Sequence, residues 1–287
     1  MNLIIISLLT LVIVGAASAI ILFFVSKKFE IVEDPRIDEV ENALPAANCG
    51  GCGFPGCRGF AIACVKADTL DKLICTVGGT PTMEKVAAIL GKNAVAAVPT
   101  IAVVRCGGTC DLRPRTNQYD GVSSCIIEHN LYGGETACTW GCLGLGDCVI
   151  SCKFDAIFIN PETLLPEVDE DKCTSCGACV KACPKLIIEL RKKGPKSRRI
   201  YVNCINKDKG AVNKKACSVA CIGCSKCEKE CDFDAITIGA NLAFIDSNKC
   251  TLCRKCVVVC PTSAIVEINF PTKKAKMETV AESVKNN

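Results

Sequence analysis

The sequence predicts an α+β protein with an N-terminal transmembrane helix, a small four-cysteine module and two repeated cysteine-rich units. Three observations carry this prediction: an uncharged apolar run near the N-terminus, 26 cysteines among 287 residues, and one spacing that recurs among those cysteines. The expected organisation is an anchor (1–26), a linker (27–47), a four-cysteine module (48–95), a connecting segment (96–137), a first unit (138–190), a hairpin insert (191–216), a second unit (217–270) and a polar tail (271–287).

The apolar run from Leu3 to Val25 predicts a membrane anchor. At about 1.5 Å per residue, a helix of this length crosses a bilayer core of about 30 Å. A cleaved signal peptide is the alternative, because residues 16–19 resemble a cleavage site, but the apolar run is too long and no charge precedes it. Lys27 and Lys28 follow the run, so the positive-inside rule places the rest of the chain on the cytoplasmic side of the cell (inner) membrane.

A compact module follows the linker. Cys49, Cys52 and Cys57 have the spacing C-x2-C-x4-C, and Cys75 returns after a helix-like segment at 58–70. Glycines between the cysteines permit the positive φ angles that a loop around a cluster requires. We expect these four cysteines to hold one [4Fe-4S] cluster (cluster 1), with a structural zinc site as the alternative. Cys64 is expected to be a small buried thiol.

Four cysteine quartets occupy the rest of the chain, and three of them read C-x2-C-x2-C-x3-C. This is the ferredoxin spacing for cubane clusters. The spacing fits disulfides poorly, because thiols stay reduced in the cytoplasm, and it fits zinc poorly, because zinc sites use separated C-x2-C pairs. The first quartet departs from the pattern, since Gly-Leu-Gly-Asp lengthens the gap between Cys142 and Cys148.

In such quartets the fourth cysteine points away from its own loop and binds the cluster of the partner quartet. The quartets therefore work in pairs. The expected ligand sets are Cys138, Cys142, Cys148 and Cys183 (cluster 2); Cys173, Cys176, Cys179 and Cys152 (cluster 3); Cys221, Cys224, Cys227 and Cys260 (cluster 4); and Cys250, Cys253, Cys256 and Cys231 (cluster 5).

The segments after the quartets form an internal repeat. Cys152-Lys-Phe-Asp-Ala-Ile is echoed by Cys231-Asp-Phe-Asp-Ala-Ile, and a proline follows both Cys183 and Cys260. One module is thus used twice, with short strands, a cluster loop and a brief helix in each copy.

Five further cysteines remain, and four of them could bind a sixth cubane; free thiols are the alternative. They are Cys106, Cys110, Cys125, Cys204 and Cys217. The segments 101–106 and 199–204 are both strand-like and end in a cysteine, so we expect them to pair and to bring Cys106 and Cys204 together.

Composition excludes several function classes. The formal net charge of +4 gives no support for nucleic-acid binding, because each oxidised cubane with its four thiolates adds about −2. The chain has no phosphate-cradling glycine motif, so neither flavin nor nicotinamide is expected. A Rieske site requires two histidine ligands, and the chain has a single histidine, His129. With 5% aromatic residues, the clusters are expected to form much of the core.

The anchor, the Cys49-Gly-Gly-Cys-Gly-Phe-Pro-Gly-Cys57 motif and the tandem quartets resemble the B subunit of the Rnf complex in its long form. Residues 140–148 and 206–210 add to this resemblance, which covers nearly the whole chain. It implies a membrane ferredoxin:NAD oxidoreductase that couples electron flow to sodium or proton translocation. This chain would be an electron wire without substrate chemistry of its own. Its partners would be soluble ferredoxin as donor, flavin- and NAD-binding subunits and integral membrane subunits.

Two other functions are compatible with the motifs: a polyferredoxin subunit of a hydrogenase-type membrane complex, and a membrane-anchored iron–sulfur sensor. The basic run 191–199 is expected to be a solvated hairpin tip, and the functional alternative is a docking surface that attracts an acidic ferredoxin through Lys192, Lys193 and Arg198. The tail at 273–287 is expected to be disordered.

Overall fold

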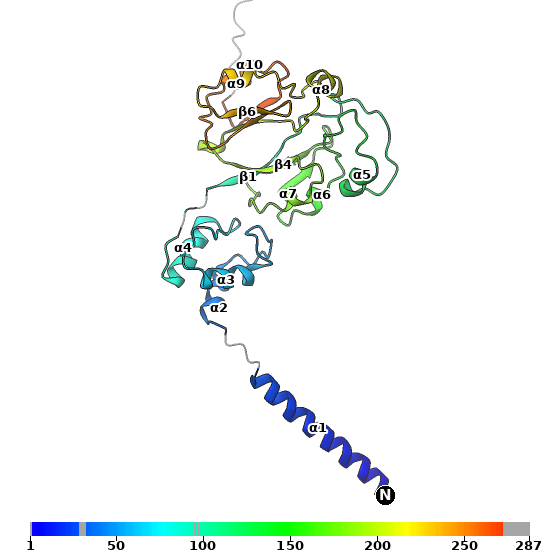
Figure 1. The fold of residues 1–287 in the computed structure, drawn as a ribbon, viewed down its shortest axis with the longest axis vertical. Helices are drawn as coiled ribbons and strands as arrows, with labels where there is room; N and C mark the ends of the chain where they lie inside the picture. Colours follow the sequence, from blue (N-terminus) through cyan, green and yellow to red (C-terminus); the bar gives the residue numbers. More distant parts are fainter. Residues whose placement is uncertain (1, 29–32, 95, 97, 272–287) are drawn as a thin grey trace, which may run out of the picture.

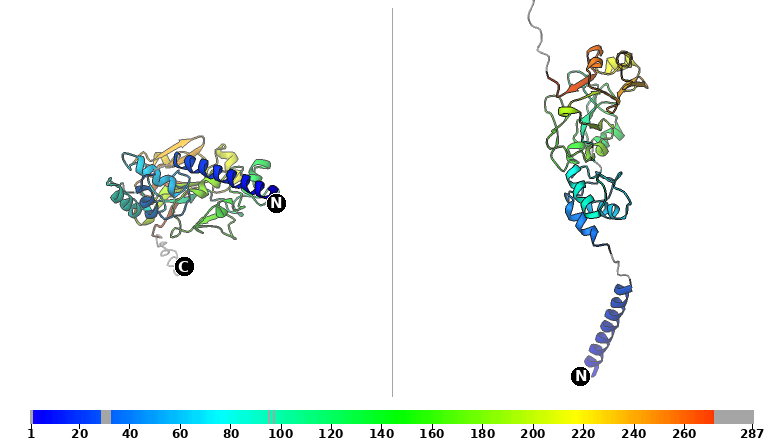
Figure 2. Two further views of the ribbon diagram at one scale, coloured as in Figure 1. Left: turned by 90° about the horizontal axis from the view of Figure 1, so that it is seen from below. Right: turned by 90° about the vertical axis from the view of Figure 1, so that its left-hand side faces the viewer.

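A computed structural model describes residues 2–28, 33–94, 96 and 98–271. The expected disorder of the tail therefore lies outside the described residues. Three parts follow one another along the chain: a long N-terminal helix, a module of three helices, and a larger part that contains all the strands of the described residues (Figure 1). Two further views show the helical module next to the strand-containing part (Figure 2).

Helix α1 (Asn2–Lys28) carries no charge before Lys27 and Lys28. Its segment Ile5–Lys28 has a mean hydropathy of 2.8, and none of it is buried against the rest of the protein. The helix is long and apolar enough to cross a membrane, as the sequence predicted.

The helical module comprises α2 (Arg36–Ala43), α3 (Cys57–Lys66) and α4 (Gly79–Leu90). Each helix contributes apolar side chains to one shared core, including Val40, Phe60 and Val86, which are almost fully buried. Helix α3 ends at Lys66, four residues before the end expected from the sequence. At this end, Lys92 Nζ donates to the carbonyl oxygens of Cys64 and Ala67. These bonds satisfy carbonyls that the end of a helix leaves unpaired.

The strands form four antiparallel pairs. Strand β1 (Thr100–Val104) pairs with β4 (Ile188–Lys192), and the hairpin β2 (Ile157–Ile159) and β3 (Pro166–Val168) lies between them in the sequence. Strand β5 (Arg199–Val202) pairs with β8 (Ile265–Ile268), and the hairpin β6 (Ile236–Gly239) and β7 (Leu242–Ile245) lies between these. The two halves share one plan, in which the outer strands pair around an inner hairpin. In both halves the first strand begins before the expected unit boundary.

The expected pairing of segments 101–106 and 199–204 is wrong. Strand β1 is opposite β4, and β5 is opposite β8. The two segments meet through side chains instead, because Ile101 and Val103 of β1 pack against Tyr201 of β5. The opposite face of β1 presents Ala102 to the cysteine-rich core of the first half. Because successive side chains of a strand point to opposite faces, β1 packs against the first-half core on one face and against Tyr201 of the second half on the other.

Short helices carry most of the cysteine loops: α5 (Cys125–Leu131), α6 (Asp147–Ile150), α7 (Ala178–Ala182), α8 (Gly210–Ala216), α9 (Lys226–Lys229) and α10 (Lys255–Val259). Helix α6 packs against α7, and α9 packs against α10. Helices this short are not stable alone, so tertiary contacts must hold them. His129 is exposed on α5.

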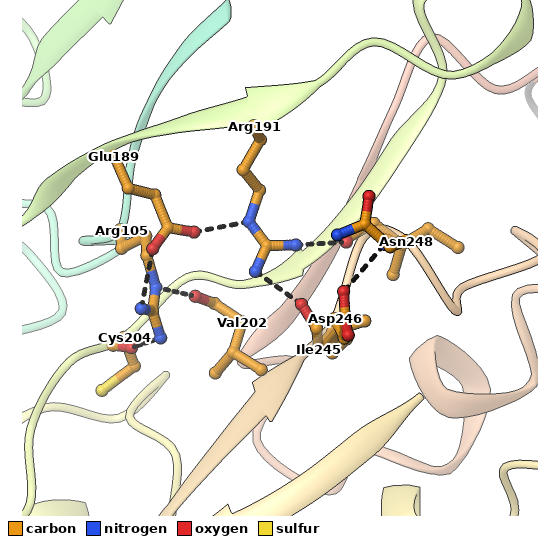
Figure 3. Close-up of polar contacts among 9 residues, drawn as sticks. Arg105, Glu189, Arg191, Val202, Cys204, Ile245, Asp246 and Asn248 are labelled. Atoms are coloured by element: carbon orange, nitrogen blue, oxygen red, sulfur yellow. Dashed lines mark hydrogen bonds and ion pairs between the residues drawn. The ribbon is translucent and has the colours of Figure 1, made fainter. Parts of the chain in front are cut away.

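A buried ion-pair network joins the two halves (Figure 3). Glu189 of β4 accepts from the guanidinium groups of both Arg105 and Arg191. Arg105 Nε also donates to the Val202 carbonyl at 3.2 Å, and Arg191 Nη2 donates to the Ile245 carbonyl at 2.7 Å. Since Val202 and Ile245 belong to the second half, the two arginines fasten β1 and β4 to β5 and β7.

The same network corrects the expectation for the basic run 191–199. Arg191 and Arg199 are buried, so the run is not a fully solvated tip. Arg199 forms an ion pair with Glu170, whereas Lys192 and Lys196 are exposed beside the short 3-10 turn η1 (Pro195–Ser197). The flanking strands β4 and β5 pair with other strands, so the run is a crossing between the two halves.

Candidate metal centres

Among the described residues, each of five voids is lined by four cysteines. With openings to solvent included, the space between protein atoms is about 390 Å³ in one void, 350 Å³ in a second and 330 Å³ in the other three. Voids of nearly one size with the same set of four thiols indicate sites for one kind of group.

The first void lies in the helical module. It brings together Cys49, Cys52, Cys57 and Cys75, the set expected from the sequence. The backbone N–H of Gly78 donates to Cys75 Sγ at 3.3 Å. Burial raises the pKa of the Cys75 thiol, and the N–H groups of Gly78 and Val77 oppose that rise. Cys64 lies outside this void in the module core, where burial raises its pKa to about 11. It is the buried thiol that the sequence predicted.

Two further voids also contain the expected sets. One is lined by Cys152, Cys173, Cys176 and Cys179 in the first half, and the other by Cys221, Cys224, Cys227 and Cys260 in the second half. In each void a backbone N–H points to one sulfur: Ala156 N to Cys152 Sγ at 3.4 Å, and Ala243 N to Cys221 Sγ at 3.5 Å. Such hydrogen bonds are one means by which a protein sets the potential of a cluster.

Three cysteines of the fifth expected set, Cys231, Cys250 and Cys256, lie in or against the core cluster of the second half. Burial raises the pKa of Cys256 to about 12, and the thiols of Cys250, Cys253, Cys227 and Cys231 add to the rise. Cys256 is buried, whereas Cys253 is exposed at the surface. Cys224, in the other set of the second half, is exposed as well.

The first quartet is arranged differently from the expectation. Cys142, Cys148 and Cys183 line one void, but its fourth cysteine is Cys125 and not Cys138. The side chain of Asp147, at the start of α6, places Cys125 there. Its Oδ2 accepts from Ser124 Oγ and from the Ile126 N–H, both at 3.1 Å, which fixes the start of α5 against α6.

Cys138 lies in another void, together with Cys106, Cys204 and Cys217. A β-bridge between Arg115 and Thr136, and the bond from Ala137 N to the Pro114 carbonyl at 3.1 Å, hold the chain before Cys138 away from α6. The five leftover cysteines therefore do not form one group. Cys106, Cys204 and Cys217 line the void that contains Cys138. Cys125 lines the void of the first quartet. Cys110 is exposed, and its Sγ lies 3.3 Å from the Glu162 carbonyl oxygen. The lengthened gap before Cys148 was the sequence signal of this change.

The donor set fits a cubane. Within the described residues, no three His, Cys, Asp or Glu side chains lie close enough together to hold a single metal ion. The cysteines instead surround voids, as binding of a larger group requires. Burial raises the pKa of several of these thiols, to about 12 for Cys148 and about 11 for Cys179. Binding must therefore expel protons, and the positive iron must compensate the buried thiolates.

Family models match three parts of the chain. An Fe-S cluster model matches residues 44–71, a 4Fe-4S binding domain matches 166–189, and a 4Fe-4S dicluster domain matches 220–264. The first match covers Cys49, Cys52 and Cys57, and the third covers most of the cysteines of the second half.

Curated relatives match over most of the chain. The B subunit of the Na⁺-translocating ferredoxin:NAD⁺ oxidoreductase complex of Acetobacterium woodii is 44% identical over 88% of this chain and 74% of its own length. The corresponding B subunit of the proton-translocating complex of Clostridium ljungdahlii is 41% identical over 99% of this chain and all of its own length. That of the ion-translocating oxidoreductase complex of Methanosarcina acetivorans is 40% identical over 88% of this chain and 93% of its own length. With such identity across nearly the whole sequence, the chain belongs to the family of B subunits of Rnf-type ion-translocating ferredoxin:NAD oxidoreductase complexes.

Proposed function

We propose that this chain carries electrons from reduced ferredoxin to partner subunits of a membrane-bound, ion-translocating oxidoreductase, without substrate chemistry of its own. The observation that carries the proposal is the succession of cysteine-lined voids along one chain. A bound cubane takes up and releases one electron at a time. The partners would include flavin- and NAD-binding subunits and integral membrane subunits.

Five sets of cysteines would hold clusters. They are Cys49, Cys52, Cys57 and Cys75; Cys125, Cys142, Cys148 and Cys183; Cys152, Cys173, Cys176 and Cys179; Cys221, Cys224, Cys227 and Cys260; and Cys231, Cys250, Cys253 and Cys256. The chain supplies backbone amides to the sulfurs, as Gly78 and Ala243 do, and excludes water with the surrounding apolar residues.

Electrons would enter at the end of the second half. Cys253 is exposed there, and the turn at Gly194 lies against the neighbouring loop, since a Cβ on Gly194 would be 2.8 Å from Leu252 Cδ1. The exposed Lys192 and Lys196 flank this turn. Their positive charge would attract an acidic ferredoxin to the surface nearest Cys253.

Electrons would leave through the helical module. A Cβ on Gly51 would lie 2.7 Å from the Cys176 carbonyl oxygen, so the Cys49–Cys52 loop packs directly on a cysteine loop of the first half. Lys153 Nζ donates to the Asn48 carbonyl at 3.5 Å and adds to this contact. The module follows α1 after a short linker, which keeps it near the membrane. With Lys27 and Lys28 at the end of α1, the modules would face the cytoplasm.

Stopped-flow reduction of the intact complex by reduced ferredoxin tests the proposal. In a Lys192→Glu/Lys196→Glu double variant we expect a reduction rate at least tenfold lower at low salt, with the difference fading as salt rises, because charge steering is screened. The control is Lys66→Glu/Lys72→Glu, which reverses two exposed lysines on the helical module and should leave the rate unchanged. Zinc in place of iron in anaerobically purified protein would contradict the function itself.

A further inference from the structure

We propose that the side-chain hydroxyls of Thr76 and Thr174 donate hydrogen bonds to cluster sulfur atoms and raise the reduction potentials of two clusters. Thr76 belongs to the helical module, and Thr174 belongs to the first half. The inference rests on the proposed function, which places one cubane in the void lined by Cys75 and another in the void lined by Cys173.

Each hydroxyl belongs to the residue that directly follows one cysteine of the set and lines the same void. Thr76 follows Cys75, and Thr174 follows Cys173. Both Oγ1 atoms are buried, and neither has a hydrogen-bond partner among the described residues. A buried polar group without a partner is costly, and proteins pair nearly all such groups. A sulfur atom in the adjoining void would accept from each hydroxyl.

The walls of these two voids offer few other polar side chains. Apart from cysteine, the described residues that line them are apolar or glycine, except Thr76, Thr174 and Ser175. The Ser175 hydroxyl already shares a hydrogen bond with the hydroxyl of Thr100. Thr76 and Thr174 are therefore the side chains at these voids that have a hydrogen to donate and no acceptor for it.

The contact between the module and the first half encloses this region. A Cβ on Gly51 would lie 2.9 Å from Thr76 Oγ1 and 2.7 Å from the carbonyl oxygen of Cys176. Gly51 thus touches Thr76 and, at the same time, the short loop that carries Thr174. Because glycine has no side chain, the two loops pack without room for water between them at this point.

The second half provides an internal comparison. Thr251 occupies there the position of Thr174, since each follows the first cysteine of a C-x2-C-x2-C run. Thr251 is exposed, and Cys253 of the same loop is exposed as well. Water can accept from the Thr251 hydroxyl, so a cluster sulfur is not needed as its partner. The effect is therefore expected for Thr174 and not for Thr251.

The direction of the effect follows from charge. Reduction adds one negative charge to a cubane, and hydrogen bonds to negatively charged acceptors are stronger than those to neutral ones. A hydroxyl that donates to a cluster sulfur therefore stabilises the reduced state more than the oxidised state. Removing the hydroxyl should lower the potential, while the four thiolate ligands remain in place.

An EPR-monitored redox titration of the reconstituted full-length chain tests the proposal. The signals of the two clusters are first assigned by their loss in Cys57→Ala and Cys179→Ala. In Thr76→Val and Thr174→Val, which keep the shape of the side chain, the equilibrium constant for reduction of the adjoining cluster should fall about tenfold. For a one-electron couple this is a potential about 59 mV lower.

Serine and the second half supply the controls. Thr76→Ser and Thr174→Ser keep a hydroxyl and should retain most of the natural potential. Thr251→Val should leave every potential unchanged. An unchanged potential in a valine variant with its full iron content would overturn the role of that hydroxyl and leave the proposed function intact. A natural chain that shows no signal after dithionite would instead overturn the proposed function.

A second measurement needs no variant. After a brief exchange of the natural chain into D₂O, hydroxyl hydrogens are replaced, whereas amide hydrogens of the core exchange slowly. Pulsed EPR should then detect a nearby deuteron at each of the two reduced clusters. Absence of this coupling would overturn the proposed hydrogen bonds, even if a valine variant failed to bind its iron.

Discussion

The guanidinium of Arg105 donates from Nη2 to the backbone carbonyl of Cys204 at 3.2 Å, although the two residues belong to different halves of the protein. Arg105 directly precedes Cys106, so the same contact brings both cysteines to one void. Glu189 forms an ion pair with this arginine, and the guanidinium carbon lies 5.7 Å from the centroid of the Phe244 ring. The contacts that join the two halves therefore also form part of the wall of the void lined by Cys106, Cys138, Cys204 and Cys217.

Removing the anion at this joint should destabilise the chain. In Glu189→Gln, the guanidinium groups of Arg105 and Arg191 remain buried without a carboxylate. We expect the apparent free energy of unfolding to fall by about 3 kcal/mol, because breaking one partner of a buried ion pair leaves uncompensated charge. Anaerobic urea denaturation followed by cluster absorbance measures the change. Glu162→Gln, at an exposed position, should leave the midpoint unchanged.

The two cysteines on α3 should respond differently to replacement. Cys57 lines a void, whereas Cys64 is fully buried in the apolar core outside it. Cys57→Ala is expected to lose about four iron atoms per chain. Cys64→Ala should keep all its iron and lose about 1 kcal/mol of stability through a small cavity. Iron quantification and thermal melting separate the two effects, and iron loss in Cys64→Ala would show that Cys64 is a ligand.

Glu128 should make stability depend on pH. It is 1% exposed on α5, and burial first, then the charge of Glu135, raise its pKa above the usual value, while Lys185 and Arg113 oppose the rise. Because the folded pKa lies above the unfolded one, stability is highest below the unfolded pKa and falls as pH rises through the folded pKa.

The Glu128→Gln variant should not lose stability as pH rises in this way, because a glutamine side chain cannot ionise. At pH 8 the variant should be more stable than the natural chain by about 1 kcal/mol, and the difference should shrink toward pH 5. Thermal melts across that range test the prediction. Glu39→Gln, on the exposed side of α2, should show no such trend, and a Glu128→Gln variant less stable at pH 8 would refute it.

Cys110 offers a probe of membrane orientation. Its thiol is exposed and lies outside every cysteine-lined void in the described residues. A membrane-impermeant maleimide should label it in inverted vesicles and not in intact cells, because the modules are expected on the cytoplasmic side. Cys110→Ser should abolish the labelling. Labelling in intact cells would place the modules outside.

Local spacing alone determined much of this protein. Cysteines three residues apart, such as Cys173 and Cys176, occupy one short loop, so their grouping around one void needs no knowledge of distant segments. The same holds for the uncharged run that forms α1, since length and apolarity suffice to predict a helix that can cross a membrane.

The tertiary structure decided what depends on distant contacts. Spacing groups Cys138 with Cys142, but the β-bridge at Thr136 and the side chain of Asp147 place Cys138 and Cys125 in different voids. The strand-like pattern of residues 101–106 also did not identify the strand that pairs with β1. Its pairing with β4 depends on burying both of its faces, one against each half. Hydrogen bonds and packing between segments far apart in the chain set these choices, and no local pattern of residues encodes them.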